Sequence, residues 1–274
     1  DMGLKTKALL LGGLAGAVYW QNAALDRHRL ICAHPALPKA FDGFSILHLS
    51  DLHFGSESMA RRKALSLKFG RPDLIAVTGD LLDRYTPEYL QTAGEWMERA
   101  CRIAPVYYVP GNHEAKDLKH YPQVRKVLEQ AGATLLENLG VLLCRGDQSI
   151  GLFGIQDPRF FEGEEDFSKT LRKLARQKPQ FSILLSHRPE RLAQYAKEAF
   201  SLVLSGHAHG GQVRLPGIPG LYAPNQGLFP QYTSGLYRRE ATQMIVSRGI
   251  GNSLHCPRLL DFPEAATIVL RRKP

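Results

Sequence analysis

Five short apolar runs in this chain each lead directly into residues that can bind a metal ion. The runs cover 44–49, 74–78, 106–109, 181–185 and 202–204. The residues that follow them are Asp51-Leu52-His53, Gly79-Asp80, Gly111-Asn112-His113, Ser186-His187 and Gly206-His207-Ala208-His209. Short apolar runs bounded by turn residues are typical of buried strands. The pattern predicts five strands that bring polar side chains to their carboxyl ends, where open α/β sheets bind ligands.

Longer amphipathic stretches lie between these runs, which makes the chain an α/β protein. Helices are predicted over 87–103, 121–131 and 167–177. Short antiparallel strands are expected within 139–155, a long loop rich in glycine, proline and aromatic residues over 210–237, and closing strands over 243–247 and 266–270. A chain of 274 residues is near the upper size for one hydrophobic core. We therefore expect one domain over 40–274, after a separate segment 1–25.

The net charge of +9 favours an anionic partner, which could be nucleic acid, an acidic membrane or a phosphorylated substrate. The basic clusters at 61–63 and 271–273 are short and far apart, so no nucleic-acid partner is expected. The four cysteines form no CxxC pair and are too few for a disulfide framework. Reduced thiols are expected.

The segment 1–25 contains an apolar stretch, 8–20, that follows Lys5 and Lys7. A membrane-spanning helix needs about 20 apolar residues, and this stretch is shorter. Three alternatives remain open: an interfacial anchor, a helix packed on the domain, and a cleaved secretion signal. The anchor alternative places the protein peripherally on the cytoplasmic face of the inner membrane, and the secretion alternative has it exported.

Each motif at a strand end has an ordinary explanation when it is taken alone. Aspartate and asparagine often form turns, and a single histidine on a loop is usually polar surface. Together, however, the motifs supply two aspartates, an asparagine and the three histidines His187, His207 and His209, each at the carboxyl end of a predicted strand. Carboxylate and amide oxygens and imidazole nitrogens are the donors that Mn, Zn and Fe accept. The set therefore predicts a site for two divalent metal ions.

The order of the motifs resembles the calcineurin-like metallophosphoesterase superfamily. Gly210-Gly211-Gln212 and Ser247-Arg248-Gly249 are similar to a bacterial, membrane-associated phosphodiesterase branch that includes enzymes of the UDP-2,3-diacylglucosamine pyrophosphatase type. Ala208 departs from the threonine of many relatives, at a position that is not a ligand. The resemblance implies a four-layer αββα sandwich of two mixed β-sheets flanked by helices.

The resemblance also implies a role for each motif residue. One metal ion would be held by Asp51, His53 and His209. The other would be held by Asn112, His187 and His207. Asp80 would bridge the two ions, and a shared water acidified to hydroxide would be the nucleophile. Mn is the first expectation for the metal, with Zn or Fe as alternatives.

Three further residues are predicted to serve catalysis. His113 would be the general acid. Asp83 would orient His113 through its other ring nitrogen, unless it is a helix-capping or turn residue. Arg248 would bind a substrate phosphate, unless it forms an ion pair at the end of a sheet.

The expected activity is hydrolysis of a phosphodiester or diphosphate bond. The anchor-like segment, the basic charge and the aromatic loop residues Tyr222, Phe229, Tyr232 and Tyr237 favour a lipid-linked substrate, such as UDP-2,3-diacylglucosamine in lipid A biosynthesis. Ordinary packing is the alternative for the aromatic residues. The alternative functions are a nuclease or general phosphodiesterase on soluble substrates, and a non-catalytic metal-binding scaffold. The sequence does not determine the oligomeric state.

Overall fold

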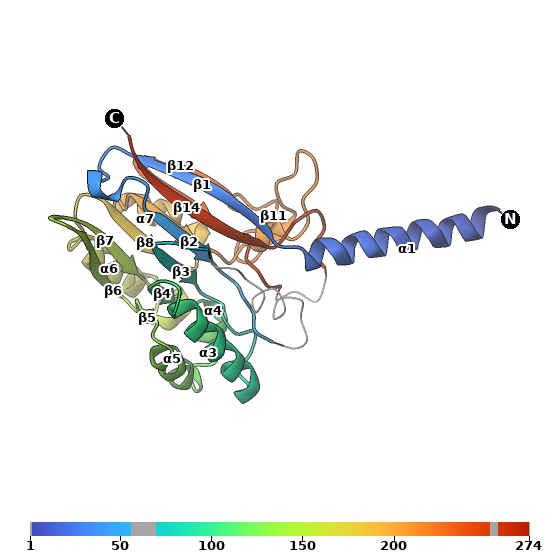
Figure 1. Ribbon diagram of the computed structural model, residues 1–274, viewed down its shortest axis with the longest axis horizontal. Coiled ribbons are helices and arrows are strands. Elements are labelled where there is room, and N and C mark those ends of the chain that lie inside the picture. Colours follow the sequence, from blue (N-terminus) through green and yellow to red (C-terminus); the bar gives the residue numbers. More distant parts are fainter. Residues whose placement is uncertain (1, 56–69, 253–256, 274) are drawn as a thin grey trace.

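The computed structural model describes residues 2–55, 70–252 and 257–273, and shows two six-stranded sheets between helices (Figure 1). The first sheet has the order β1 (Asp26–His34), β14 (Glu264–Arg272), β2 (Ser45–Leu49), β3 (Leu74–Thr78), β4 (Val106–Val109) and β5 (Thr134–Leu135). The second has the order β12 (Gly235–Arg239), β13 (Thr242–Val246), β9 (Leu202–Ser205), β8 (Ser182–Leu185), β7 (Gln148–Gly154) and β6 (Leu139–Arg145). Both sheets are mixed, because β14 runs antiparallel to β2, and β6 and β12 run antiparallel to their neighbours.

Three clusters of buried apolar residues separate four layers. Successive residues of a strand point to opposite faces of the sheet. Ile75 and Val77 accordingly pack with Trp96 of a covering helix, whereas Leu74 and Ala76 face the second sheet. The outer face of the second sheet packs against its own helices. The predicted four-layer αββα sandwich is confirmed.

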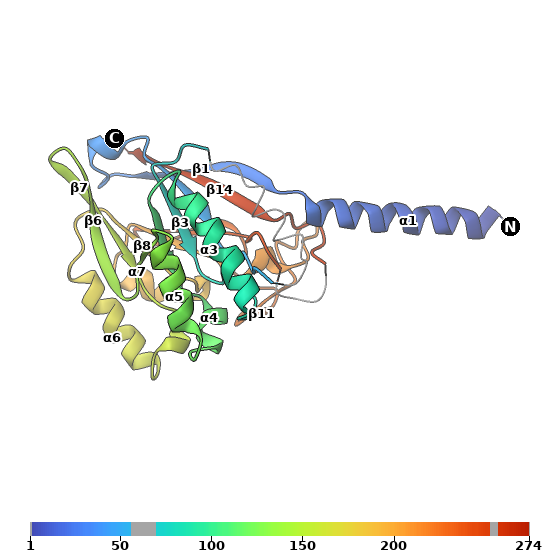
Figure 2. The same ribbon diagram turned by 60° about the horizontal axis from the view of Figure 1, so that its bottom comes forward.

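The helices cover the outer faces of the two sheets, as Figure 2 shows from below. The α-helices on the body of the molecule are α3 (Pro87–Cys101), α4 (Asn112–Lys116), α5 (Tyr121–Gln130), α6 (Glu164–Ala175) and α7 (Leu192–Lys197). Short 3-10 helices are η1 (Lys39–Phe41), η2 (Pro158–Phe160), η3 (Pro189–Arg191) and η4 (His209–Gly211). Helix α6 begins three residues before its predicted start, because three acidic residues of its first turn favour a helix N-terminus.

Two regions differ from the sequence-based expectation. β1 was not predicted, and it pairs in parallel along the whole of β14, which is longer than the predicted strand 266–270. The first sheet therefore includes residues that precede the predicted domain start at 40. The expected loop 210–237 contains the short hairpin of β10 (Tyr222–Ala223) and β11 (Gly227–Leu228). The basic cluster 61–63 and Cys256 lie outside the described residues.

Residues 2–23 form helix α1 (Met2–Ala23), which projects away from the sheets in both views (Figures 1 and 2). Its apolar side chains are largely exposed, with Leu11 at 67% and Leu14 at 60%. Gln21 and Asn22, at its end, are instead buried against the body. Among the described residues, no helix is both long and apolar enough to cross a membrane.

Candidate metal centre

The residues predicted to bind metal lie where the chain leaves β2, β3, β4, β8 and β9. Five of them have a positive backbone φ: 51° at Asp51, 46° at His53, 51° at Asp80, 69° at His207 and 46° at His209. A non-glycine residue in this conformation costs about 1–3 kcal/mol and persists only where surrounding contacts impose it. The strain turns each loop sharply at the strand end and aims these side chains into one buried site.

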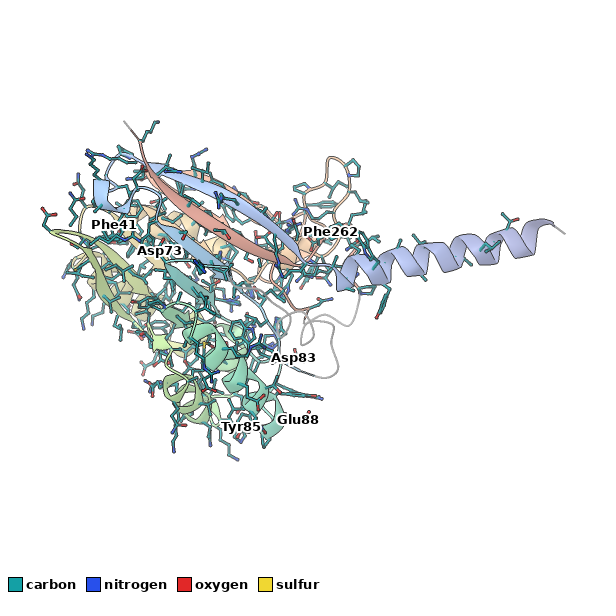
Figure 3. The ribbon with its side chains drawn as sticks, in the orientation of Figure 1. Phe41, Asp73, Asp83, Tyr85, Glu88 and Phe262 are labelled. Atoms are coloured by element: carbon teal, nitrogen blue, oxygen red, sulfur yellow. The ribbon has the colours of Figure 1, made fainter. Side chains whose placement is uncertain are left out.

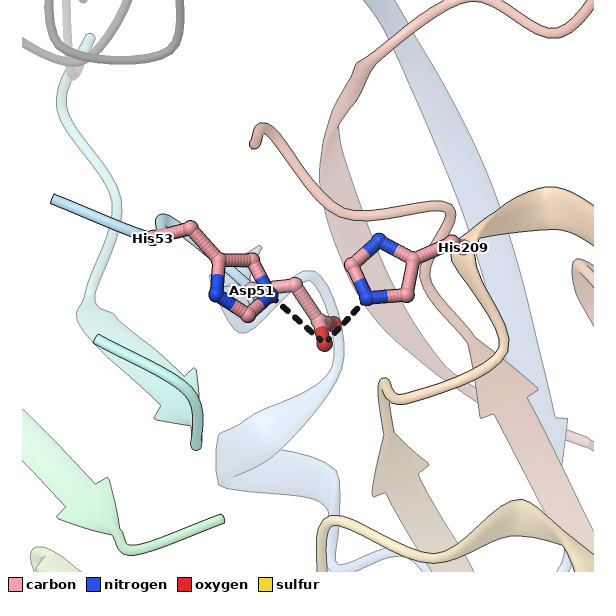
Figure 4. Close-up of side chains that lie close together, drawn as sticks. All are labelled: Asp51, His53 and His209. Atoms are coloured by element: carbon pink, nitrogen blue, oxygen red, sulfur yellow. Dashed lines mark ion pairs between the residues drawn. The ribbon is translucent and has the colours of Figure 1, made fainter. Parts of the chain in front are cut away.

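The first cluster consists of Asp51, His53 and His209, shown in Figure 4. One ligand atom from each residue lies within 4.8 Å of those of the other two. Asp51 Oδ1 is 3.5 Å from His209 Nε2 and 3.9 Å from His53 Nε2. The two imidazole rings stack with their centroids 5.1 Å apart. All three residues are buried, so the cluster is shielded from bulk water.

The second cluster consists of Asp80, His187 and His207. His187 Nε2 is 3.3 Å from Asp80 Oδ2 and 3.2 Å from His207 Nδ1. Its other ring nitrogen lies 2.7 Å from the Thr78 carbonyl, to which it donates, and this directs Nε2 into the site. Asn112 Oδ1 approaches the same Nε2 at 3.2 Å. The predicted ligands of the second metal therefore converge.

Asp80 lies between the two clusters. Its Oδ2 atom, which faces His187, is also 3.8 Å from His53 Nε2 in the first cluster. Glu114 fixes the Asp80 loop by accepting hydrogen bonds from the backbone N–H groups of Asp80 at 3.0 Å, Leu81 at 2.8 Å and Gly111 at 2.8 Å. This bracing role of Glu114 was not predicted, although the residue follows directly in the Gly111-Asn112-His113-Glu114 motif.

The buried charges of the site balance one another. Burial by itself would lower the pKa of His187, but Asp80, with Asp51 and Asp157, outweighs burial and raises that pKa to about 10. Burial opposes ionisation of Asp80, yet His187, His113 and His53 hold its pKa well below the usual range. In the metal-free protein His187 and Asp80 therefore form an ion pair. A cation that binds His187 must displace its proton.

The other imidazoles are in the form that binds metal. Burial lowers the pKa of His53 and of His209 to about 3 in each case, so both rings are neutral near pH 7. Both ring nitrogens of His53 are buried and have no hydrogen-bond partner among the residues that the structure describes. A metal ion would satisfy one of them. Neutral imidazoles and carboxylates, with no thiolate in either cluster, fit two divalent cations of the Mn, Fe or Zn type.

Comparison with known proteins identifies the family. The model for the calcineurin-like phosphoesterase domain matches residues 44–211. This chain belongs to the calcineurin-like phosphoesterase family. It is therefore a metal-dependent phosphoester hydrolase, and the family and the residue clusters together indicate a dinuclear divalent metal site.

Several relatives of this phosphoesterase share most of its length. It is 30% identical to the metallophosphoesterase YkuE of Bacillus subtilis, over 95% of this chain and 90% of that protein. It is 26% identical to the phosphodiesterase YaeI of Escherichia coli, over 83% and 82%. The crystal structure of the phosphopantetheinyl hydrolase PptH of Mycobacterium tuberculosis has a TM-score of 0.50 and 13% identity, over 75% of this chain and 89% of that one. This last likeness supports the fold alone.

His113 lies at the edge of the metal centre of this phosphoesterase. Its Nδ1 donates to the backbone carbonyl of Asp83 at 2.7 Å, and its Nε2 is 3.0 Å from Lys116 Nζ. The Asp83 carboxylate is farther away, at 3.7 Å from Nδ1. Asp83 thus orients the ring chiefly through its main chain, and this was not predicted. The role of His113 as general acid stays a prediction.

Arg248 pairs with carboxylates of the first sheet. Its guanidinium contacts Glu264 and Asp26, the arrangement that the ion-pair alternative describes. Its role in binding a substrate phosphate stays a prediction.

Arg188 and Asn225 are neighbours of the centre that were not predicted. Arg188 is buried, is paired with Asp157, and lies 2.8 Å from His207 Nε2. Asn225 Oδ1 lies 3.0 Å from the same nitrogen and can accept a hydrogen bond from it. That hydrogen bond would leave His207 Nδ1 free for a metal ion. Arg188 could have been predicted, because it directly follows the motif residue His187. Asn225 lies in the 210–237 loop, where no sequence motif indicates a role in the metal centre.

Proposed function

We propose that this phosphoesterase cleaves phosphodiester or diphosphate bonds with an activated water held at Asp80 between two metal ions. The observation that carries the proposal is the position of Asp80, whose Oδ2 atom faces His53 of one cluster and His187 of the other. A carboxylate in this place can serve two cations at once. The name of the relative YaeI, a phosphodiesterase, supports the preference for diesters.

The residues around the two clusters have separate tasks in this mechanism. When bound, two divalent ions polarise the phosphoryl group and acidify the attacking water. Asp51 and Asp80 supply the negative charge that retains the cations. His113 Nε2, which is 3.9 Å from Asp80 Oδ2, lies beside the phosphoryl position and can contact the departing oxygen. Lys116 adds a positive charge at the same point.

Mn is the metal that we propose first, with Zn or Fe as alternatives. Both clusters combine imidazole nitrogen with carboxylate oxygen, which suits all three ions. Because Zn binds most nitrogen and oxygen sites more tightly than Mn, the metal found after purification would reflect availability as well as preference.

A lipid-linked substrate is the proposed substrate class, with a peripheral position on the cytoplasmic membrane face. The exposed apolar residues of α1 support it, as do Tyr222 at 42% exposure and Phe229 at 66% in the 210–237 loop. Tyr232 and Tyr237 instead pack edge to face at 5.1 Å, as the packing alternative expects. UDP-2,3-diacylglucosamine is the candidate to assay, and soluble diesters are the alternative.

The test is hydrolysis of bis(p-nitrophenyl) phosphate and of UDP-2,3-diacylglucosamine with added Mn. Metal-dependent turnover of either substrate, lost in Asp80→Asn and reduced in His113→Ala, supports the two-metal mechanism. A lipid turnover far above that of the soluble diester supports the lipid-linked substrate. Turnover that does not depend on metal, or that survives Asp80→Asn, contradicts the mechanism. Absence of turnover of both substrates favours the scaffold alternative.

A further inference from the structure

A cavity of about 160 Å³ opens beside His113, on the side of the metal centre formed by α4 and α5. It extends from Asp83 and His113 to Tyr85 and His120. Figure 3 shows Asp83 and Tyr85 on the same flank of the molecule, near α3. Because His113 Nε2 is 3.9 Å from Asp80 Oδ2, one end of this cavity borders the position of the reacting phosphoryl group.

Two stacked aromatic rings are among the groups that line the cavity. The rings of Tyr85 and His120 stack with centroids 4.2 Å apart and an angle of 6° between their planes. The buried residues Leu82, Tyr121 and Val124 also line the cavity. Two charged residues, Arg84 and Asp117, line it as well, and the Asp117 carboxylate lies 2.8 Å from His120 Nδ1. Planar aromatic surfaces favour planar ligands, and stacking of a base on an aromatic side chain is worth about 1–3 kcal/mol.

The end that faces the metal centre is polar. The hydrogen bond from His113 Nδ1 to the Asp83 carbonyl fixes the ring with Nε2 directed to the site. Lys116 Nζ, at 3.0 Å from Nε2, places an ammonium group at the same end. An oxygen that leaves phosphorus with negative charge would meet these two groups first. The cavity therefore offers His113 and Lys116 to the departing oxygen, and aromatic and apolar side chains to the group attached to it.

We propose that this cavity binds the leaving group of the ester, and that the leaving group carries a planar aromatic ring which stacks near Tyr85 and His120. The inference rests on the proposed phosphoesterase function and adds a substrate class to it. The residues that line the cavity include His113 but none of the seven predicted metal ligands.

The experiment measures binding of three phosphate monoesters to the Mn-loaded full chain by calorimetry. Phenyl, cyclohexyl and methyl phosphate share the group that binds metal and differ in the group that would enter the cavity. Phenyl phosphate is expected to bind about 10-fold more tightly than methyl phosphate, which corresponds to about 1.4 kcal/mol of stacking. Cyclohexyl phosphate, which is apolar but not planar, should bind less tightly than phenyl phosphate.

Variants of Tyr85 locate the effect. Tyr85→Ala should reduce the phenyl-to-methyl ratio to near one, while Tyr85→Phe should keep it, because the ring is retained. Leu142→Ala, at an exposed side chain of β6 that does not line the cavity, is the control and should leave the ratio unchanged.

Three outcomes would contradict the proposal. Equal binding of phenyl and methyl phosphate, or a ratio that Tyr85→Ala does not change, overturns it. Equal binding of phenyl and cyclohexyl phosphate overturns the inference that the leaving group is planar and stacks. Failure of the proposed function is recognised separately, as the absence of metal-dependent turnover of bis(p-nitrophenyl) phosphate.

Discussion

At the scale of single residues, the metal centre combines strained backbone with buried charge. The positive φ angles of Asp51, Asp80 and His209 are imposed by contacts around the site, and the Glu114 carboxylate supplies several of them. The candidate metal ligands could be named from the sequence because each belongs to a short motif at a strand end. Glu114 and Asn225 could not be assigned roles in this way, because their partners lie far away in sequence and meet only in the fold.

The first prediction concerns Glu114. Glu114→Gln keeps the size of the side chain but replaces one acceptor oxygen with an N–H donor facing backbone N–H groups. We expect a loss of about 1–3 kcal/mol in the free energy of unfolding, and a fall of about 10–100-fold in Mn affinity because the Asp80 loop loosens. Urea denaturation and Mn titration measure the two effects. Glu98→Gln, at an exposed i,i+4 ion pair, is the control and should change neither.

The second prediction concerns pH. His48 is buried on β2, 2.9 Å from Thr78 Oγ1, and burial lowers its pKa to about 3. In the unfolded chain its pKa is about 6.5. The folded state thus binds fewer protons than the unfolded state between these two pH values. The contribution of neutral His48 to the free energy of unfolding is therefore fully present above about pH 6.5 and is lost as the pH falls towards 3.

His48→Gln removes this titrating group, so the free energy of unfolding should fall less steeply as the pH is lowered below 6.5. Between pH 6.5 and pH 5, we expect the free energy of unfolding of the variant to fall by about 2 kcal/mol less than that of the wild type. The measurement is urea unfolding in the presence of a chelator, so that metal release does not contribute. Parallel profiles for the two proteins would show that His48 is not the group responsible.

At the scale of elements, helix α1 is tied to the metal centre through its last turn. Asn22 pairs with Arg258, accepting from its N–H at 3.0 Å and donating to its carbonyl at 2.8 Å. The buried Arg258 guanidinium in turn contacts the Gly251 carbonyl and lies 3.3 Å from His209 Nδ1. The N–H of Gly251 donates to the Asp51 carbonyl at 2.7 Å. A continuous chain of contacts thus links α1 to the first metal cluster.

The third prediction follows from this chain. Asn22→Leu breaks both hydrogen bonds to Arg258 while keeping the charge of the arginine, and should weaken Mn binding about 10-fold. Arg258→Lys, which keeps the charge but shortens the reach, should have a similar effect. Leu14→Gln, on the exposed part of the same helix, should have none. If Asn22→Leu binds Mn as the wild type does, α1 does not support the site.

Elements also differ in how well the sequence predicts them. The strands that carry the motifs are fully buried apolar runs and were predicted close to their observed bounds. β1 was missed because its sequence begins with charged and polar residues and its side chains alternate between half-buried and exposed. Such a strand at the edge of a sheet is fixed by its pairing with β14, which is distant in sequence.

At the scale of the whole molecule, the metal centre joins the two sheets. Asp51 and Asp80 follow strands of the first sheet, while His187, His207 and His209 follow strands of the second. A cation bound by both groups links the two halves of the sandwich. Metal binding is therefore expected to stabilise the whole fold and not only its loops.

The fourth prediction measures this linkage. Mn at about 100 times its Kd should add about 2.7 kcal/mol of stability, which is about 5–10 °C in Tm for a chain of this size. Asp80→Asn should abolish most of the shift. Asp147→Asn, at the exposed turn between β6 and β7, should leave it intact. A shift of equal size in both variants would mean that Mn acts elsewhere on the molecule.

Helix α1 has a largely exposed part and a last turn that is buried against the body, and this difference has a consequence for how such proteins can diverge. The exposed part of α1 contributes little to the phosphoesterase fold, so in evolution it can be lengthened, shortened or exchanged for another segment. Gln21 and Asn22 are under a different constraint, because their amide groups hold the backbone of Arg258 and Asp261 in place. Relatives that occupy different compartments are thus expected to vary in the exposed part of α1. They should keep two amide side chains, or side chains that make equivalent hydrogen bonds, at its C-terminal end.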